Sequence, residues 1–245
     1  MNPSISGTNP FQNLQTRLAG LVGATQPGER LPAEPELARQ MGVSRATLRE
    51  AMRTLESAGL IRRRQGVGTF VVSTSHVIDT GLEVLESIES LASKMQLDVA
   101  MGALKITEVE ASEEQAEIFS VLKGTPLVQV SRVIFAENRP VAYLVDVLPE
   151  DILKPEDLQQ EFTGSVLDFL MRHGTYKLAN SLTEIQAVAA SSEIARALEI
   201  QRGDVLLLFI ARLFTTMGKT VDHSLSFFLP GYFRFHVIRK VEQLT

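Results

Sequence analysis

The sequence predicts an α+β fold in two parts: helices and a β-hairpin in the N-terminal part, and an antiparallel sheet with flanking helices in the C-terminal part. Three observations predict it. Apolar residues recur at helical spacing up to about residue 57, and two strand-like runs around glycines follow. Beyond residue 110, a pattern of one helix and one hairpin occurs twice. The charge also divides, because residues 1–72 hold nine Arg and five Glu, a balance of +4, in a chain of net charge −5.

Three helices are expected first. Apolar spacing predicts a helix from about Asn9 to Ala24, and the Pro and Gly residues of "QPGERLP" end it. The stretch "EPELARQM" predicts a short second helix. After the turn "GVS", Ser44 is placed to cap a third helix that runs to about Ser57. Two helices joined by a three-residue turn containing glycine form a helix-turn-helix, whose second helix enters the major groove of DNA.

The third helix carries arginines at a spacing of four, which places them in one stripe beside its apolar face. The planar fork of arginine can bind guanine or a phosphate with two hydrogen bonds. The strands "LIRRR" and "GTFVV" follow as a wing, and glycines at its tip allow close approach to DNA. The alternative is an exposed helix with solvated arginines and an ordinary hairpin, but the ordered set of elements favours DNA binding. The candidate DNA-binding residues are Ser44, Arg45, Thr47, Arg49, Arg53, Gln65 and Gly66.

The stretch "GERLPAEPELARQMGVSRATLREAMRTLESAGLIRRRQGVGTFVV" resembles the winged helix-turn-helix of GntR-type bacterial transcription regulators. The family pattern is roughly G-x-x-L-P-S-E-R-E-L-A, then G-V-S-R-x-T-V-R-x-A-L-x-x-L, then G-L-I and G-x-G-T-F-V. The resemblance implies that Arg45, Thr47 and Arg49 contact the groove and phosphates, and that Gly66 lies at the minor groove.

One departure from the family pattern affects DNA contacts. Ala33 and Pro35 stand where the family usually has Ser and Arg, and that Arg usually contacts DNA. The resemblance therefore implies that one contact per subunit is missing. Pro35 still suits the first turn of a helix, so the fold is expected to be kept.

Residues 73–81 are expected to be a linker, because the chain is polar there and the charge balance changes. This gives a DNA-binding domain over 1–72 and a second domain over 82–245. In the second domain, residues 111–149 and 190–230 resemble each other: each begins Ala-Ser, forms a helix ending at a glycine, and enters a strand with one arginine (Arg132, Arg212). Two such units can pair their hairpins into one antiparallel sheet, with the helix of "GSVLDFLMRHG" between them.

This second domain resembles the effector-binding domain of the HutC branch of GntR regulators, called UTRA, over about Leu82 to Val241. UTRA shares its fold with chorismate lyase, and the resemblance implies that it binds a small metabolite. In members that bind sugar phosphates, the pattern is Arg-x-Arg, then Pro-x-x-x-Glu, then an acid before a Tyr. Here the first Arg and the acid are kept, and apolar residues replace the other three. The implied effector-binding residues are Ser87, Arg132, Ile134, Leu144, Ser165, Asp222 and Phe228.

A phosphate needs several fixed donors, preferably two arginines. With one arginine and apolar walls, the pocket is expected to bind an effector with a single acidic or polar group and a sizeable apolar body, rather than a sugar phosphate. The alternatives are that Arg132 lies on a strand surface and that the apolar replacements belong to the core. We expect a homodimer, formed through the C-terminal sheets, that binds a pseudo-palindromic double-stranded DNA operator.

Catalysis is less favoured. The chain has no cysteine, and its four histidines show no metal-ligand spacing, so neither a metal nor a cofactor is expected. Asp222, His223 and Ser224 are triad residue types, but neighbours on a strand point to opposite faces. A chorismate-lyase-like enzyme with an accessory DNA-binding head remains the alternative, and a winged helix used only for protein contacts is a third possibility.

The sequence also bears on location. The first residues, "MNPSISGTNP", lack the pattern of a signal peptide, and the longest apolar run, "DVLLLFIARLF", is too short to span a bilayer. We therefore expect a cytoplasmic, nucleoid-associated protein with no membrane partner.

Overall fold

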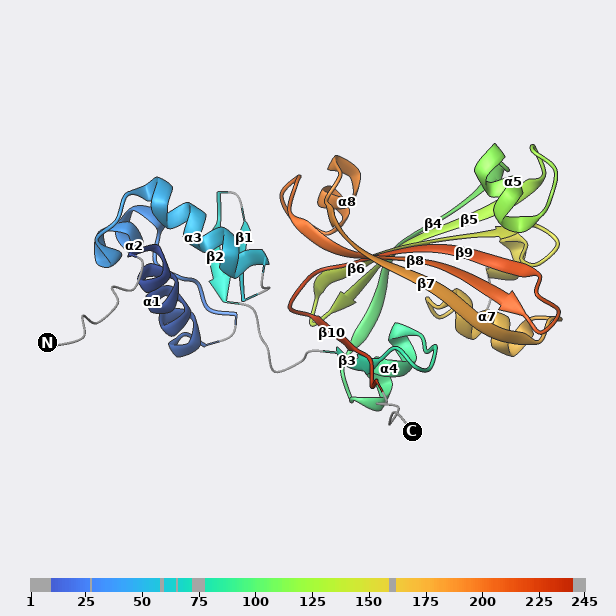
Figure 1. Cartoon of the computed structure of the whole chain (residues 1–245), viewed down its shortest axis with the longest axis horizontal. Helices are drawn as coiled ribbons and strands as arrows, with labels where there is room; N and C mark the ends of the chain where they lie inside the picture. The colour runs from blue at the N-terminus through green and yellow to red at the C-terminus, as the bar shows by residue number, and fades with distance from the viewer. Residues whose placement is uncertain are drawn as a thin grey trace, which may run out of the picture. The chain divides into compact units, whose positions relative to one another are not determined.

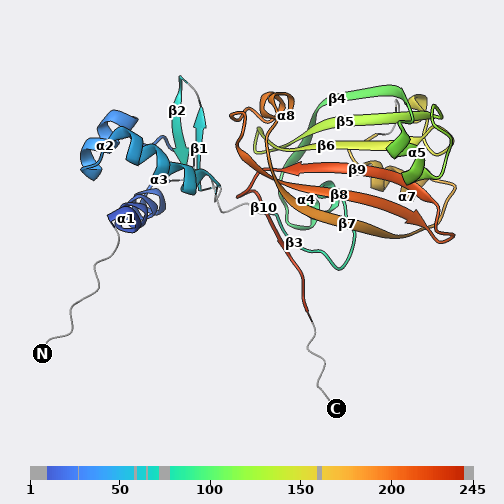
Figure 2. The same ribbon diagram turned by 45° about the horizontal axis from the view of Figure 1, so that its top comes forward.

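The computed structural model describes residues 10–26, 28–57, 60–64, 66–71, 78–158 and 162–239. They form two compact units (Figures 1 and 2): the residues before Ile78 with Pro230–Tyr232, and Ile78–Leu229 with the residues from Phe233 on. The predicted α+β class is confirmed: the first unit is helical with a hairpin, and the second is built on an antiparallel sheet. None of the described helices is long and apolar enough to cross a membrane.

The N-terminal unit consists of three helices and one hairpin, as the sequence predicts. Each helix turns an apolar stripe inward, and the three stripes meet in one core that includes Leu18, Leu37, Leu48 and Met52, all at most 1% exposed. The elements are α1 (Pro10–Ala24), α2 (Glu34–Met41), α3 (Arg45–Ser57), β1 (Ile61–Arg64) and β2 (Gly68–Val71).

Local capping residues fix the turn between α2 and α3. Gly42 ends α2 in the left-handed conformation with φ 70°, which glycine adopts without a Cβ penalty. Two residues later, Ser44 Oγ accepts a hydrogen bond from the backbone N–H of Thr47 at 3.1 Å, as predicted for an N-cap. These two residues set where the recognition helix begins.

The wing is an antiparallel pair of β1 and β2, in which Ile61 lies opposite Val71. The segment before α2 adds to it, because the backbone N–H of Leu31 donates to Thr69 O at 2.8 Å. The backbone at Gly68 has φ 142°, and a Cβ there would lie 2.3 Å from Arg30 Nε. Only glycine fits at this position.

The C-terminal unit contains a six-stranded antiparallel sheet with the order β4-β5-β6-β9-β8-β7 (Figure 2). Each copy of the repeat supplies three neighbouring strands. Counted inward from either edge of the sheet, these are the first, second and third strand of one copy. The predicted helix and hairpin of each copy are present, and each copy also begins with a strand that the sequence reading missed. The first copy is β4 (Val99–Glu110), α5 (Glu113–Phe119), β5 (Pro126–Ala136) and β6 (Arg139–Pro149); the second is β7 (Leu178–Ala189), α8 (Ser192–Ala197), β8 (Val205–Thr215) and β9 (Thr220–Phe228).

Smaller elements complete this unit on the face of the sheet opposite α5 and α8 (Figure 1). They include a parallel strand pair, in which Phe233 lies opposite Ile78. The last four residues of the segment suggested as a linker, 78–81, belong to this pair. The elements are β3 (Ile78–Gly81), α4 (Ile88–Lys94), η1 (Pro155–Asp157), α7 (Val166–His173) and β10 (Phe233–His236).

Candidate DNA interface and effector cavity

The outer face of α3 presents the candidate DNA-binding side chains to solvent. Arg45, Thr47, Arg49 and Arg53 are all exposed, while Leu48 between them is fully buried. The division follows from helical spacing, which places residues one turn apart on the same side. The helix therefore offers a basic stripe over a fixed apolar base.

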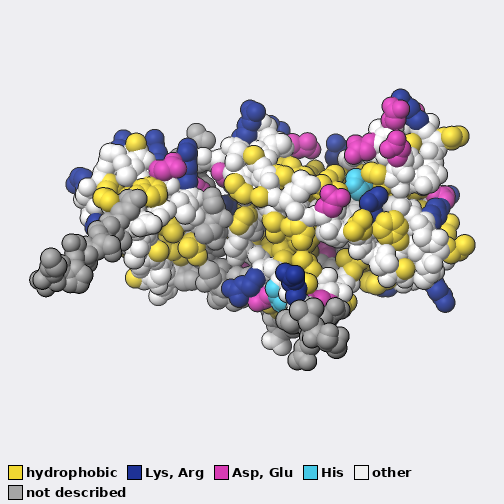
Figure 3. Space-filling view, viewed as in Figure 1, with side chains coloured by type: hydrophobic (Ala, Val, Ile, Leu, Met, Phe, Trp, Pro, Cys, Tyr) yellow, Lys and Arg dark blue, Asp and Glu magenta, His cyan; other side chains and the backbone are white. Residues whose placement is uncertain are grey.

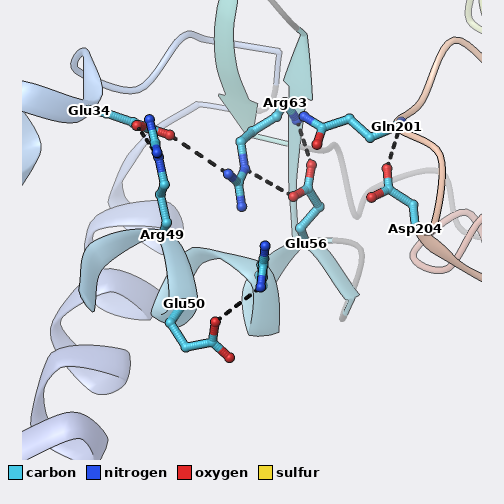
Figure 4. Close-up of polar contacts among 8 residues, drawn as sticks. Glu34, Arg49, Glu50, Glu56, Arg63, Gln201 and Asp204 are labelled. Atoms are coloured by element: carbon cyan, nitrogen blue, oxygen red, sulfur yellow. Dashed lines mark hydrogen bonds and ion pairs between the residues drawn. The ribbon is translucent and has the colours of Figure 1, made fainter. Parts of the chain in front are cut away.

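A connected chain of ion pairs lies along this stripe (Figure 4). Arg49 Nε donates to Glu34 Oε2 at 2.8 Å, and the other oxygen of Glu34 lies 3.7 Å from Arg63 Nη1. Arg63 Nε is also 3.0 Å from Glu56 Oε2. Because the Arg49 side chain is 52% exposed, its ion pair is weak, so a phosphate can replace the carboxylate.

Glu34 lies beside Pro35, at the departure from the family pattern. Pro35 occupies the first turn of α2, where a missing N–H costs nothing, and the helix forms as predicted. The same turn directs Glu34 toward Arg49 of α3. A carboxylate that holds a recognition-helix arginine thus comes from the segment that lacks the usual arginine.

The remaining candidates divide by their local bonding. The hydroxyls of Ser44 and Thr47 lie 2.8 Å apart, so Ser44 both caps α3 and contacts Thr47. Gly66 is exposed at the wing tip with φ 76° and no atom near the position of a Cβ. Gln65 lies outside the described residues.

The C-terminal unit contains a cavity of about 740 Å³ on the sheet face that β3, α4, α7 and β10 also border. Of the predicted effector residues, Ser87, Arg132, Leu144, Ser165, Asp222 and Phe228 line it.

Ile134, the remaining predicted effector residue, does not line this cavity. It is fully buried. It follows Arg132 by two residues on β5, so its side chain lies on the same face but about 7 Å further along the strand. There it packs into the sheet instead of facing the cavity.

The polar centre of the cavity joins three strands. Arg132 of β5 forms a buried ion pair with Asp146 of β6, and Asp222 of β9 lies beside them. Burial and the negative charge of Asp146 raise the pKa of Asp222 well above its usual value. Asp222 Oδ1 and Arg132 Nε are buried without a hydrogen-bond partner among the described residues. Open bonding capacity therefore remains at the centre of the cavity.

Sequence reasoning missed Asp146. Period-two alternation along β6 could have found it, because Leu144 lies opposite Arg132 and Asp146, two residues further on, shares its face. An acidic residue on the inward face of an apolar strand indicates a buried partner or a ligand.

The two predicted serines have structural bonds that also bring helices together. Ser87 Oγ accepts from the N–H of Ser90 at 3.0 Å and donates to Asp168 Oδ2 at 2.6 Å, which ties α4 to α7. Ser165 Oγ accepts from the N–H of Asp168 at 3.0 Å and caps α7. Both hydroxyls thus fix α4 and α7, which form the roof of the cavity.

A second part of the cavity wall, formed by residues of β8, β9 and β10, is apolar and aromatic. The rings of Phe209 and Phe228 lie 5.2 Å apart, and Phe235 lies 4.5 Å from Phe209 and 5.0 Å from Phe228 between centroids. In the view of Figure 3, hydrophobic side chains gather at the centre of this unit. The cavity thus pairs a charged centre with an aromatic wall.

The geometry does not assemble hydrolytic chemistry. Asp222 and Ser224 line the cavity, while His223 between them lies opposite Val147 and does not. Burial lowers the pKa of His223. Within the described residues, no group of three or more acidic or histidine side chains could hold a metal ion.

Comparison with known proteins agrees with this two-part architecture. Residues 13–71 match the family described as bacterial regulatory proteins, gntR family, and residues 94–234 match the UTRA domain. The repressor NagR of Bacillus subtilis is 27% identical over 225 residues, covering 92% of this chain and 90% of that protein. The histidine utilization repressor of Klebsiella aerogenes is 31% identical over 216 residues, covering 85% and 84%.

Solved structures show the same fold. PhnF from Mycobacterium smegmatis superposes with a TM-score of 0.64 at 20% identity, covering 94% of this chain and all of that chain. The possible regulator YydK from Bacillus subtilis gives 0.57 at 20% identity, covering 95% and 100%. The relatives are named as repressors and regulators, not as enzymes, which favours the regulator over the lyase-like alternative.

Proposed function

The chain belongs to the GntR family of bacterial regulatory proteins, as a transcriptional repressor of the HutC type with a UTRA domain, and from this premise we propose how it works. Two copies bind one pseudo-palindromic operator, and a small molecule in the C-terminal cavity changes that binding. The observation that carries the proposal is the combination of an exposed arginine stripe on α3 with a cavity in the sheet unit.

The DNA half of the proposal rests on α3 and the wing. Arg45, Thr47 and Arg49 enter the major groove from the first turns of α3, as recognition helices do. Gly66 brings the wing backbone to the minor groove or the phosphates. The exposure of these residues and the weak hold of Glu34 on Arg49 support these roles.

The dimer half rests on symmetry and on the sheet. A protein that reads a two-fold operator needs two copies related by a two-fold axis. Strands β4 and β7 are the edges of the six-stranded sheet and carry unpaired backbone groups that a second copy can cover. Leu182 on β7 is 50% exposed, which supports contact at that edge.

The effector half rests on the cavity lining. One arginine that already holds a carboxylate, with aromatic rings opposite, suits a ligand with a single acidic or polar group and an apolar body. A sugar phosphate would need several free donors, and Arg132 offers only part of one fork. The ligand acts by binding one arrangement of the dimer more tightly than the other.

The test uses the full-length protein and a labelled duplex from upstream of its own gene, with a scrambled duplex as the control. We expect preferential binding to the upstream duplex and protection of two half-sites about one helical turn apart. Native mass spectrometry of the same sample reports the number of chains and any ligand that co-purifies. Equal affinity for both duplexes, or protection of one half-site by a single chain, would overturn the proposal.

A further inference from the structure

The cavity contains more carboxylates than cations. Its lining residues include Glu83, Glu86, Glu89, Asp146 and Asp222, against the one arginine described above. Glu86 is paired with Lys94, and Glu83 accepts the backbone N–H of Ile238. Two buried carboxyl groups, those of Glu89 and Asp222, are left without a cation of their own.

Individual carboxylate oxygens of Asp222 and Glu89 have no hydrogen-bond partner among the described residues. Asp222 lines the cavity and is 7% exposed, and its Oδ1 is buried without a hydrogen-bond partner among the described residues. Glu89 Oε1 is likewise buried without a hydrogen-bond partner among the described residues. The guanidinium of Arg132 is bound to Asp146, so its single charge is shared among three carboxyl groups.

The pKa values of these groups agree with the geometry. Burial raises the pKa of Glu89, and burial together with the charge of Asp146 raises that of Asp222. Arg132 lowers the pKa of both groups, but burial outweighs it, so both resist ionisation. A bound cation would reverse this effect.

We propose that the effector carries a protonated amine or another cationic nitrogen, which binds between Asp222 and Asp146 while its apolar body contacts Phe209 and Phe228. This inference rests on the proposed effector role of the cavity and narrows the polar group to a cation. The ammonium donates N–H···O hydrogen bonds to the carboxylates. The aromatic wall adds a favourable face for positive charge.

An anionic ligand fits less well. It would have to take Arg132 from Asp146, which leaves that carboxylate buried without a partner. It would also lie against Asp222, and the unpartnered Arg132 Nε offers only one donor. A neutral ligand avoids the repulsion but brings no positive charge to the carboxyl group of Asp222.

The proposal fixes the sign of the pH dependence. A cation binds the ionised form of Asp222, so binding releases its proton to solvent, and affinity rises with pH while the amine stays protonated. The charged groups near Asp222 are Arg132 on β5 and Asp146 on β6, with Glu89 on α4 and Asp168 on α7 at the roof. Glu89 would contribute in the same direction, and an anionic ligand would show the opposite slope.

The experiment compares 2-phenylethylamine, 2-phenylethanol and 3-phenylpropionate by calorimetry with the full-length protein. We expect the amine to bind about tenfold or more tighter than the alcohol, and more tightly at about pH 8 than at about pH 6. Asp222→Asn should remove this preference and leave alcohol binding unchanged, while the control Asp98→Asn, at an exposed position, should change nothing.

Equal or tighter binding of the carboxylate, or no detectable amine binding at millimolar concentration, would overturn the inference. If Asp222→Asn does not fold, Glu89→Gln tests the same preference from α4 and should reduce it. Operator binding is measured on the same samples. Operator recognition with a cavity that prefers carboxylates refutes only this inference, whereas loss of operator recognition with amine preference kept refutes only the proposed function.

Discussion

Replacing Arg132 with leucine tests whether the charged centre of the cavity is a buried ion pair. The side chains of Arg132 and Asp146 are 5% and 9% exposed, so the substitution leaves a carboxylate buried beside a second one at Asp222. Breaking a buried pair on one side costs about 3–5 kcal/mol in the free energy of unfolding.

The assay is urea unfolding of the full-length protein at one protein concentration, because association makes midpoints depend on concentration. The double variant Arg132→Leu with Asp146→Leu should recover most of the loss, since replacing a buried pair by apolar residues is often neutral. A loss below about 1 kcal/mol for Arg132→Leu, as at an exposed pair, would refute the reasoning. So would a double variant that is as unstable as the single one.

Further predictions concern the DNA interface, the wing and the pH dependence. Arg49→Ala should weaken operator binding by about 1–3 kcal/mol and leave ligand binding intact, whereas Arg202→Ala, at an exposed position in the other unit, should change neither; loss of both activities would mean that Arg49 is structural. Gly68→Ala should lower the melting temperature because a backbone with φ 142° is strained for a residue with a Cβ, while Gly20→Ala, in open space on α1, should raise stability by roughly 0.5–1 kcal/mol. The reverse order would contradict the wing geometry. Asp222→Asn should be more stable than the parent protein at neutral pH. The folded pKa of Asp222 lies above 3.8, so the parent protein loses stability as pH rises past that value, and the variant does not. A difference in free energy of unfolding between the two proteins that does not widen with pH would contradict this.

Local signals predicted the N-terminal unit well. The helical spacing of buried leucines and the caps at Gly42 and Ser44 act within a few residues, so the sequence alone places α1, α2 and α3. The confirmed family pattern then identifies the face that carries Arg49. The ion pair between Glu34 and Arg49 was out of reach, because it joins two helices whose side-chain directions depend on packing.

The C-terminal unit was predicted less completely, for a physical reason. Strands β4 and β7 are sheet edges with mixed exposure, so neither shows the continuous apolar run of a buried strand such as β5. The β3–β10 pair joins Ile78 to Phe233, and no local pattern reports a contact across that separation. The cavity inherits the same limitation, since Asp146 matters only through its neighbours on other strands.

The parallel pair β3–β10 gives the cavity a thermodynamic role beyond holding a ligand. Thr80 and Gly81 of β3 and Phe235 of β10 line the cavity, and β3 is the first described strand after the DNA-binding unit along the chain. If a ligand and an operator favour different arrangements of this pair, each changes the affinity of the other by the same factor. Under the proposed function, operator DNA would then itself lower the affinity of the cavity for the ligand, and a cell with many operator sites would need more ligand to occupy it.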